Sequence, residues 1–318
     1  FGNGKERGHK AEKDLIKQEI RKFTNIDILA LYKLLFNNED CFYSLLPNKE
    51  HPESIREIRE FTKENLETDD LHYDDAIAIT YLYLKIYGNN EYKNIKHVVI
   101  DEAQDYYPLQ YKLFHLLFPN AKFTILGDMN QTLAKREDLS FYEQIQTILN
   151  RKKSSLILLD KSFRCTSEIL NFSLQFVEQR SPLKSFNRNG DHPELLIAEN
   201  AESYTDMIVK EVKLCQEKGL QSIGLICKTE SNASHLFHKI QDKLDVQLIT
   251  NESVSELQGV FIIPVYMSKG LEFDAVLICD ADSQNYYDAD DKNLLYVACS
   301  RALHKLALFC ETEVSPLI

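Results

Sequence analysis

The chain has 318 residues and a formal net charge of -12 at pH 7, with 44% hydrophobic and 27% charged residues. This length allows two domains of ordinary size, and the composition excludes a disordered or fibrous protein. No apolar run reaches the roughly 18 residues of a membrane span, and the opening FGNGKERGHK lacks the apolar core of a signal peptide, so we expect a cytoplasmic protein without membrane contact.

The net negative charge of the chain limits the kinds of molecule that it can bind. Proteins that hold nucleic acid mainly through phosphate contacts usually carry a basic footprint, and this chain has none overall. Any nucleic-acid contact must therefore come from a local patch, or the main partner is of another kind. The seven cysteines include no CxxC pair, which predicts reduced, mostly buried thiols rather than disulfides or a zinc site.

The N-terminal part has helical periodicity. Residues 10–66 repeat apolar residues at helical spacing, and a further helix over 76–88 is expected to be capped by Asp74 and Asp75 and to stop at Gly88. Nothing in this part carries recognisable chemistry.

From residue 95 onward, short apolar strands alternate with helical segments, which predicts βαβ units and a mainly parallel sheet. One strand is expected to end just before Asp101 and one just before Asp128. A further strand is expected over SLILLD (155–160). The last helix is expected over 293–306, followed by a short final strand. The polar stretch NRKKSS suggests a boundary near residue 152.

Acidic residues end the first of these strands. In HVVIDEAQD, Asp101 and Glu102 follow the apolar run, at the sheet edge where open α/β proteins bind ligands. In nucleotide hydrolases, one such acid holds Mg²⁺ and the other can orient and deprotonate the attacking water. The pair alone is equally compatible with a solvated loop.

Three more residues have side chains suited to phosphate contacts. Gln131, in GDMNQT after Gly127, is a neutral hydrogen-bonding group able to sense a terminal phosphate. Arg164 precedes a predicted helix and Arg301 lies within the last one; arginines so placed can bind phosphate oxygens and stabilise transition-state charge. For either arginine alone, a surface salt bridge is the alternative.

The order of the motifs adds a resemblance. DEAQD, GDMNQT, SFRCT, SKGLEFDAV and YVACSRA closely resemble motifs II to VI of the superfamily 1 helicases of the UvrD/Rep type, over residues 95–310. Within that group, DEAQDYYPLQ followed by LFPNAKFTILGDMNQ looks most like the HelD proteins, UvrD-like ATPases associated with bacterial RNA polymerase.

The resemblance implies an α/β fold of the RecA-like P-loop NTPase type, with two parallel-sheet domains, the first incomplete. Residues 1–70 would be a helical segment adjoining the first motor domain. Residues 71–152 would be the partial first RecA-like domain with motifs II and III, and residues 153–318 the second, with motifs IV to VI. ATP and Mg²⁺ would bind in the cleft between them.

The resemblance also implies individual roles. Asp101 would hold Mg²⁺, Glu102 would be the general base, and Gln131 would report the γ-phosphate to the DNA-binding side. Arg164 and Arg301 would contact phosphates.

Two residues of motif V receive roles on the same basis. Gly270 would allow its close turn, and Glu272 would contact the nucleotide sugar.

The phosphate-binding loop departs from the family pattern. No G-x-x-x-x-G-K-[ST] motif occurs in the sequence. Gly219 and Gly224 have the spacing of its two glycines, but Leu225 and Ile226 stand where the motif needs Lys and Ser or Thr. The family places this loop before motif II, so we expect a truncated part of a longer helicase rather than a natural loss. The chain alone is then expected to be inactive.

Two further departures concern nucleic acid. Thr132, Leu133 and Ala134 follow Gln131, where UvrD-type motors carry aromatic residues that stack on DNA bases. About 100 residues separate SFRCT from YMSKG, too few for the large inserted subdomain of UvrD and Rep. Three hypotheses therefore remain: a monomeric helicase or translocase acting on DNA, a HelD-like module that docks on RNA polymerase, or a catalytically inactive scaffold.

Overall fold

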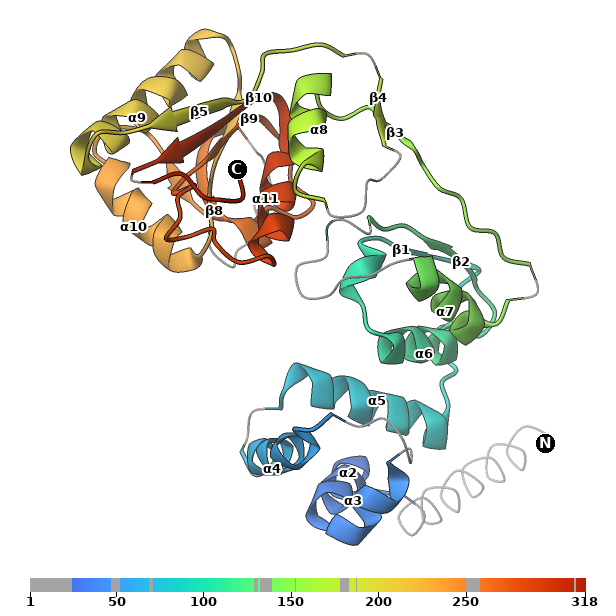
Figure 1. Cartoon of the computed structure of the whole chain (residues 1–318). Coiled ribbons are helices and arrows are strands. Elements are labelled where there is room, and N and C mark those ends of the chain that lie inside the picture. Colours follow the sequence, from blue (N-terminus) through green and yellow to red (C-terminus); the bar gives the residue numbers. More distant parts are fainter. Residues whose placement is uncertain are drawn as a thin grey trace, which may run out of the picture. The chain divides into compact units, whose positions relative to one another are not determined.

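The computed structural model of the chain describes residues 25–46, 52–68, 71–128, 131, 139–151, 153–177, 183–186, 188–249, 258–311 and 313–318. The chain divides into two compact units (Figure 1). The first unit takes Phe1–Asp101, Tyr106–Ile125 and Glu143–Lys152, and the second takes Glu102–Asp105, Leu126–Tyr142 and Lys153–Ile318.

The first unit begins with helices around an aromatic cluster. These are α2 (Ile28–Asn37), α3 (Glu39–Leu45), α4 (Ile55–Leu66) and α5 (Tyr73–Tyr87). The buried side chains of Tyr32, Phe36, Phe42 and Leu66 form the cluster. The helical periodicity predicted for this region is confirmed over the described residues, whereas its part before residue 25 lies outside them.

The start of α5 differs from the prediction. Its N-cap residue is His72, so Asp74 and Asp75 lie inside the first turn and do not cap the helix. Asp75 is buried, and its Oδ1 accepts a hydrogen bond of 2.8 Å from the Tyr32 hydroxyl. The sequence pattern predicts that the Asp75 carboxylate caps the helix, but in the structure it makes a tertiary hydrogen bond instead. The predicted stop at Gly88 is confirmed, with φ +71° at the C-cap.

Two parallel strands complete the first unit. They are β1 (His97–Ile100) and β2 (Lys122–Ile125), with His97 opposite Lys122 in register. Along the chain, the 3₁₀ turn η1 (Ala103–Asp105) and helix α6 (Pro108–Leu117) connect them, and α7 (Leu139–Leu149) follows. Asp101 directly follows β1, as predicted.

The second unit is built on a six-stranded sheet in which all pairings are parallel. The order across the sheet is β5 (Glu194–Ile197), β10 (Ala302–Cys310), β9 (Phe273–Ile278), β6 (Ser222–Cys227), β8 (Gly259–Pro264) and β7 (Gln247–Leu248).

Helices cover both faces of this sheet (Figure 1). On one face lie α9 (Ala201–Glu217) and α10 (Glu230–Ile240), and on the other α8 (Ser167–Leu174) and α11 (Asp291–Cys299). Because successive strand residues point to opposite faces, Leu225 packs with α9 and α10 while Ile226 packs with α8 and α11. Strands that are buried on both faces have apolar residues at nearly every position in the sequence. The predicted α/β class with parallel sheets is confirmed.

The strand expected over 155–160 is wrong. This segment is irregular, and Ile157 and Leu159 are 75% and 80% exposed. Only the two-residue β3 (Lys161–Ser162) follows, paired with β4 (Lys184–Ser185). An apolar run becomes a strand only where another strand accepts its backbone hydrogen bonds, and none of the described strands pairs with 155–160.

The last predicted helix is too long. Helix α11 ends at Cys299, and β10 already begins at Ala302. Alternate residues of β10 bury on opposite faces: Leu306 and Leu308 pack with α8 and α11, whereas Ala307 packs with α9 and α10. This period of two overrides the helical pattern of the sequence. Arg301 therefore lies at a helix-to-strand junction, between α11 and β10.

Six of the seven cysteines are buried and all seven are free thiols, as predicted. None of the helices in the described part of the chain is long and apolar enough to cross a membrane.

Candidate functional site

The segment after β1 orients the Glu102 carboxylate. Glu102 has φ +49°, a left-handed conformation that is uncommon for residues other than glycine and that clusters at functional sites. The backbone N–H of Ala103 donates to the Leu126 carbonyl at 2.8 Å, which fixes this turn beside the end of β2. Gln104 Nε2 donates to Glu102 Oε2 at 2.5 Å, so the carboxylate is held in one direction.

Gln104 also bridges to the segment after β2. Its Oε1 accepts a hydrogen bond of 3.0 Å from the Asp128 backbone N–H. A Cβ at Gly127 would lie 2.6 Å from Gln104 Oε1 and 2.5 Å from the Tyr142 hydroxyl. A larger residue here would therefore displace the ends of the Gln104 and Tyr142 side chains, whereas the backbone φ of Gly127 is not in the left-handed range that favours glycine.

Gln131 and Arg301, two predicted site residues, contact each other in the second unit. Arg301 Nη2 donates to Gln131 Oε1. Gln131 Nε2 in turn donates to Asp128 Oδ2 at 2.8 Å. Both side chains are buried, with Gln131 7% and Arg301 1% exposed. The segment after β2 is thus joined to the junction between α11 and β10.

The remaining contacts of Arg301 go to neutral oxygens. Its Nε donates to the Val297 carbonyl at 3.1 Å and its Nη1 to the Leu271 carbonyl at 3.5 Å. No carboxylate among the described residues lies within ion-pair distance of this guanidinium, although the field of Glu102 and Asp128 acts on it.

Burial and the nearby Arg164 guanidinium both lower the pKa of Arg301. An arginine nevertheless stays protonated in proteins. The positive charge of Arg164 thus acts on the buried guanidinium, and the carboxylates of Glu102 and Asp128 offset part of its effect. This charge arrangement fits a bound phosphate group.

Arg164 and Glu272 form a second pair. Arg164 Nε lies 2.7 Å from Glu272 Oε1, and both side chains are about 40% exposed. Gly270, two residues before Glu272, has φ +75° and open space around its Cβ position, so its backbone conformation is what requires glycine.

Asp101 belongs to the first unit and directly precedes Glu102 in the chain. It is exposed at the carboxyl end of β1. No group of three His, Cys, Asp or Glu side chains in the described part of the chain could hold a metal. A Mg²⁺ site based on Asp101 would therefore depend on water and phosphate oxygens for its other ligands, which is how Mg²⁺ usually binds beside nucleotides.

Sequence reasoning missed an ion pair that lies inside two of its motifs. Lys269 Nζ, in SKGLEF, lies 2.6 Å from Asp105 Oδ1, in DEAQD. The Lys269 side chain is only 14% exposed. Both residues could have been noticed in the sequence, because each is charged and lies within three positions of a predicted site residue. The sequence does not show, however, that two positions so far apart form an ion pair.

An exposed aromatic pair beside Arg164 was also missed. The rings of Phe163 and Phe186 lie 4.6 Å apart and are 64% and 59% exposed. An exposed pair of rings of this kind offers a stacking surface for a base.

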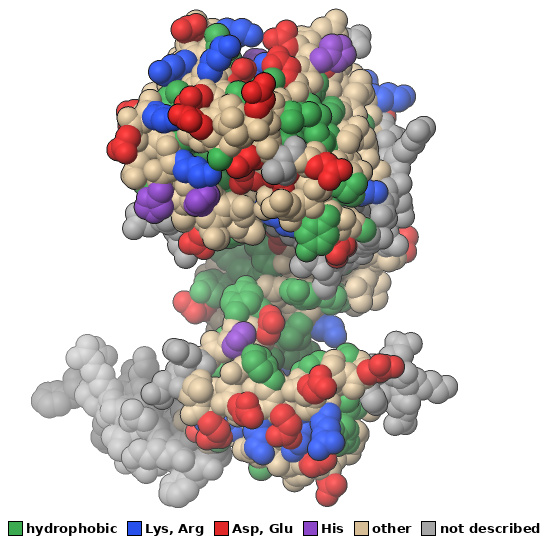
Figure 2. Space-filling model, turned by 60° about the vertical axis from the view of Figure 1, so that its left-hand side comes forward, with side chains coloured by type: hydrophobic (Ala, Val, Ile, Leu, Met, Phe, Trp, Pro, Cys, Tyr) green, Lys and Arg blue, Asp and Glu red, His purple; other side chains and the backbone are tan. Residues whose placement is uncertain are grey.

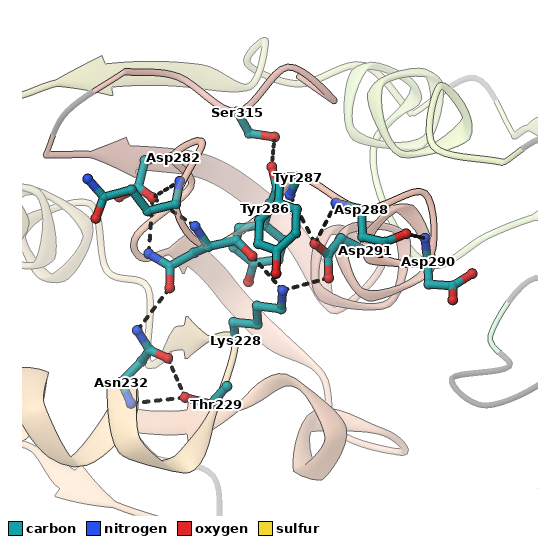
Figure 3. A network of polar contacts seen from close by, with 12 residues as sticks. Lys228, Thr229, Asn232, Asp282, Tyr286, Tyr287, Asp288, Asp290, Asp291 and Ser315 are labelled. Atoms are coloured by element: carbon teal, nitrogen blue, oxygen red, sulfur yellow. Dashed lines mark hydrogen bonds and ion pairs between the residues drawn. The ribbon is translucent and has the colours of Figure 1, made fainter.

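A polar network holds the start of α11, the helix that leads into Arg301 (Figure 3). Lys228, directly after β6, pairs with Asp291 Oδ1 at 2.7 Å. Asp291 Oδ2 accepts from the backbone N–H groups of Tyr287 and Asp288, at 2.9 and 3.0 Å. Burial opposes ionisation of Asp291, but the Lys228 hydrogen bond and these backbone donors lower its pKa overall.

Comparison with known proteins assigns the family. Residues 6–133 match the UvrD/REP helicase N-terminal domain, and residues 259–309 match the UvrD-like helicase C-terminal domain. Together the two matches take in more than half of the chain, in the order that the motifs predict. The chain belongs to the UvrD/Rep helicase superfamily.

Individual relatives agree with this. A protein of Acanthamoeba polyphaga mimivirus, provisionally named an ATP-dependent DNA helicase, is 27% identical over 68% of this chain and 34% of its own length. The ATP-dependent DNA helicase srs2 of Schizosaccharomyces pombe is 30% identical over 38% of this chain and 14% of its own length. This UvrD/Rep chain thus spans about a third or less of these two relatives.

A solved structure of the C-terminal domain of a possible DNA helicase from Lactobacillus plantarum has 30% identity, with a TM-score of 0.43. The match covers 49% of this chain and 91% of that one.

Five of the seven predicted site residues of this UvrD/Rep chain thus fall into three groups. Gln131 and Arg301 are in direct contact, Arg164 and Glu272 form an ion pair, and Glu102 is oriented by Gln104. The aromatic positions that the family pattern places after Gln131 lie outside the described residues, so the expectation at 132–134 stays a prediction.

Proposed function

We propose that this chain is the C-terminal part of the motor of an ATP-dependent DNA helicase or translocase, and that the whole motor hydrolyses ATP between two RecA-like domains. The observation that carries the proposal is the buried bond between Gln131 and Arg301, in which a guanidinium without a carboxylate partner among the described residues meets a neutral amide. A buried charge of this kind is costly unless a counter-charge completes it. The γ-phosphate of ATP is a suitable counter-charge.

The roles follow from the chemistry of each side chain. Bound ATP and Mg²⁺ supply the transferable phosphoryl group and a counter-ion for its charge. Asp101 would hold the metal ion, and Glu102, oriented by Gln104, would take the proton of the attacking water.

Arg301 would stabilise charge on the transferred group, and Gln131 would exchange its bond to Arg301 for one to phosphate. That exchange is how nucleotide state would reach the rest of the motor.

Arg164 and Glu272 would separate when nucleotide binds. Their ion pair is about 40% exposed on each side, and such pairs contribute only about 0.2 to 1 kcal/mol. A phosphate for Arg164 and a sugar hydroxyl for Glu272 can replace it at small cost. Gly270 would keep the backbone beside Glu272 in the required turn.

Two substitutions in the longer protein that carries this chain test the proposal. Glu102→Gln should abolish ATP turnover while leaving ATP binding largely intact, because the amide keeps the shape but cannot take a proton. Arg301→Ala should lower turnover by about 10³-fold or more. Glu202→Gln, an exposed position in α9, is the matched control and should change neither. Wild-type turnover in the Glu102 or Arg301 variant would refute the assigned role.

The 318-residue chain by itself should not turn over ATP at a helicase rate. Its sequence has no G-x-x-x-x-G-K-[ST], and the backbone cradle and lysine of that loop are the main anchor of the β- and γ-phosphates. We expect steady-state turnover well below about 1 s⁻¹, measured by phosphate release. A helicase-like rate would mean that another segment anchors the phosphates.

The net charge favours a second candidate function. A chain at -12 repels phosphate backbones, so a HelD-like module that docks on RNA polymerase is the alternative. Size-exclusion chromatography of the chain with purified bacterial RNA polymerase discriminates the two. Co-elution at micromolar concentration would favour docking, and separate elution together with measurable binding to single-stranded DNA would favour the DNA motor.

A further inference from the structure

A short segment of the second unit runs beside the stretch of chain that carries Arg164. It comprises residues 184–186 and 188–190, and its strand β4 pairs in parallel with β3, just before Arg164. The hydroxyl oxygens of Ser185 and Ser167 lie 2.7 Å apart. The two stretches are therefore joined along their length, although they are about 20 positions apart in the sequence.

The same segment holds the beginning of α8. The Ser167 backbone N–H donates to the Arg188 carbonyl at 2.7 Å, and the Gly190 backbone N–H donates to Glu168 Oε2 at 2.8 Å. A Cβ at Gly190 would lie 2.5 Å from Cγ2 of the buried Thr166, so the two backbones approach closely here. The first N–H groups of a helix have no acceptor within the helix. The bond from Ser167 satisfies one of them and fixes the turn before α8.

The Arg188 side chain adds a contact to Arg164 itself. Its Nη1 donates to the Arg164 carbonyl at 2.9 Å, and its Nη2 lies 2.8 Å from Nδ1 of His304 in β10. Because a guanidinium can only donate, the imidazole nitrogen is the acceptor. Asp274 Oδ1 lies 4.0 Å from His304 Nε2 on the other side of the ring. The half-buried Arg188 thus ties the Arg164 backbone to the central sheet.

We propose that Arg188 is a positioning residue for Arg164. It holds the Arg164 backbone still while the Arg164 side chain exchanges Glu272 for a phosphate oxygen, an exchange that rests on the function proposed above. The Arg164 side chain is 40% exposed and free to swing, so only its backbone can fix where the guanidinium arrives. The planar fork of Arg188 donates from two nitrogens in a rigid geometry, and it fixes direction as well as distance.

Hydrogen exchange of the 318-residue chain tests the contact without any ATPase activity. The Ser167 amide reports local opening of the segment, because its acceptor is the Arg188 carbonyl. Arg188→Ala should speed its exchange at least tenfold. Lys213→Ala, which removes an exposed cation of α9 in the same unit, is the matched control and should leave the rate unchanged. Equal Ser167 rates in wild type and Arg188→Ala would overturn the proposal.

ATP turnover in the longer protein that carries this chain tests the positioning role. Arg188→Ala should lower turnover about tenfold or more, since a displacement of about 1 Å near reacting groups can cost up to about 10²-fold. In an Arg164→Ala background the same change should have no further effect, because no side chain is left to position. Effects that multiply in the double variant would overturn the proposal, because they would show that Arg188 acts independently of Arg164.

Arg188→Lys separates the fork from its charge. Lysine keeps the charge but donates from a single nitrogen, so it should recover only part of the lost turnover. Full recovery would overturn the two-point contact. Should Arg188→Ala fail to fold, His304→Ala removes only the exposed ring beside the fork, and it should shift Ser167 exchange and turnover in the same direction by about twofold or more.

The outcomes also separate this inference from the proposed function. Loss of turnover in Arg164→Ala together with wild-type turnover in Arg188→Ala would overturn the positioning role alone. Wild-type turnover in Arg164→Ala would refute the phosphate contact of Arg164, and with it a catalytic reason for positioning that residue.

Discussion

At the scale of single residues, Gln131 is the side chain on which two motifs converge. Its amide accepts from Arg301 and donates to Asp128, and it is 7% exposed. Replacing it with Leu keeps the volume but leaves a buried guanidinium N–H and a carboxylate oxygen without this partner.

Gln131→Leu should lower the free energy of unfolding by about 1 to 3 kcal/mol, the usual cost of stranding buried polar groups. Gln146→Leu, at an exposed position of α7, should stay within about 0.5 kcal/mol. Urea denaturation of the two variants measures the difference. Equal stability would mean that the contact with Arg301 is not formed in solution.

Asp291 gives a residue-scale prediction for pH. Its pKa is lowered in the folded state, so it contributes stability above the unfolded value of about 3.9, and that contribution is lost as pH falls through the folded pKa. At neutral pH, Asp291→Asn should cost about 1 to 3 kcal/mol, since it weakens hydrogen bonds to a charged group. The wild type should then lose this advantage as the pH is lowered below about 4.

Asp245→Asn, an exposed aspartate before β7, is the control and should keep the wild-type pH profile. Thermal melts between neutral pH and pH 3 would show the two profiles. If Asp291→Asn retains the full acid dependence of the wild type, the Lys228 pair does not stabilise the start of α11.

At the scale of secondary structure, the segment over 155–160 shows that an apolar run does not by itself make a strand. Leu156, Ile157, Leu158 and Leu159 are 51 to 80% exposed, whereas Ile226 in β6 is fully buried. Both runs have the same apolar character, and they differ only in whether neighbouring strands and helices cover them.

Substituting serine at both Ile157 and Leu159 should therefore change the free energy of unfolding by no more than about 0.5 kcal/mol per site. Ile226→Ala should cost about 2 to 5 kcal/mol, because it opens a cavity between α8, α11 and the sheet. The double serine variant should also bind less of a hydrophobic dye and aggregate more slowly. A loss of several kcal/mol in that variant would show that the segment is buried in solution.

At the scale of the whole molecule, charge governs the encounter with nucleic acid. On the face in view in Figure 2, acidic and basic side chains are interspersed, and the described residues of that face show no continuous basic patch. With a net charge of -12, the chain must bind a phosphate backbone against its own field.

We therefore predict weak binding of single-stranded DNA, with a dissociation constant no tighter than about 10⁻⁵ M near physiological salt. Fluorescence anisotropy with labelled strands at two salt concentrations measures it. Submicromolar binding with a steep salt slope would show that a local basic channel outweighs the net charge, and it would strengthen the translocase proposal over polymerase docking.

Several features of this UvrD/Rep chain were determined by the sequence alone. Strands that are buried on both faces are apolar at nearly every position, so the apolar sequences of β6 and β9 predicted a parallel sheet. Local backbone chemistry placed the helix stop at Gly88, and the apolar run before them placed Asp101 and Glu102 directly after a strand. The order of the motifs then indicated the helicase superfamily.

Tertiary structure alone decided which side chains meet. Arg301 is read from the sequence as a helical residue, yet strand pairing of β10 places it at a junction, where it contacts Gln131, 170 positions away. The pairs Arg164 with Glu272 and Lys269 with Asp105 were equally hidden. Periodicity and propensity describe what a residue needs from its surroundings. They do not name the distant segment that supplies it, because that choice is made by packing across the whole unit.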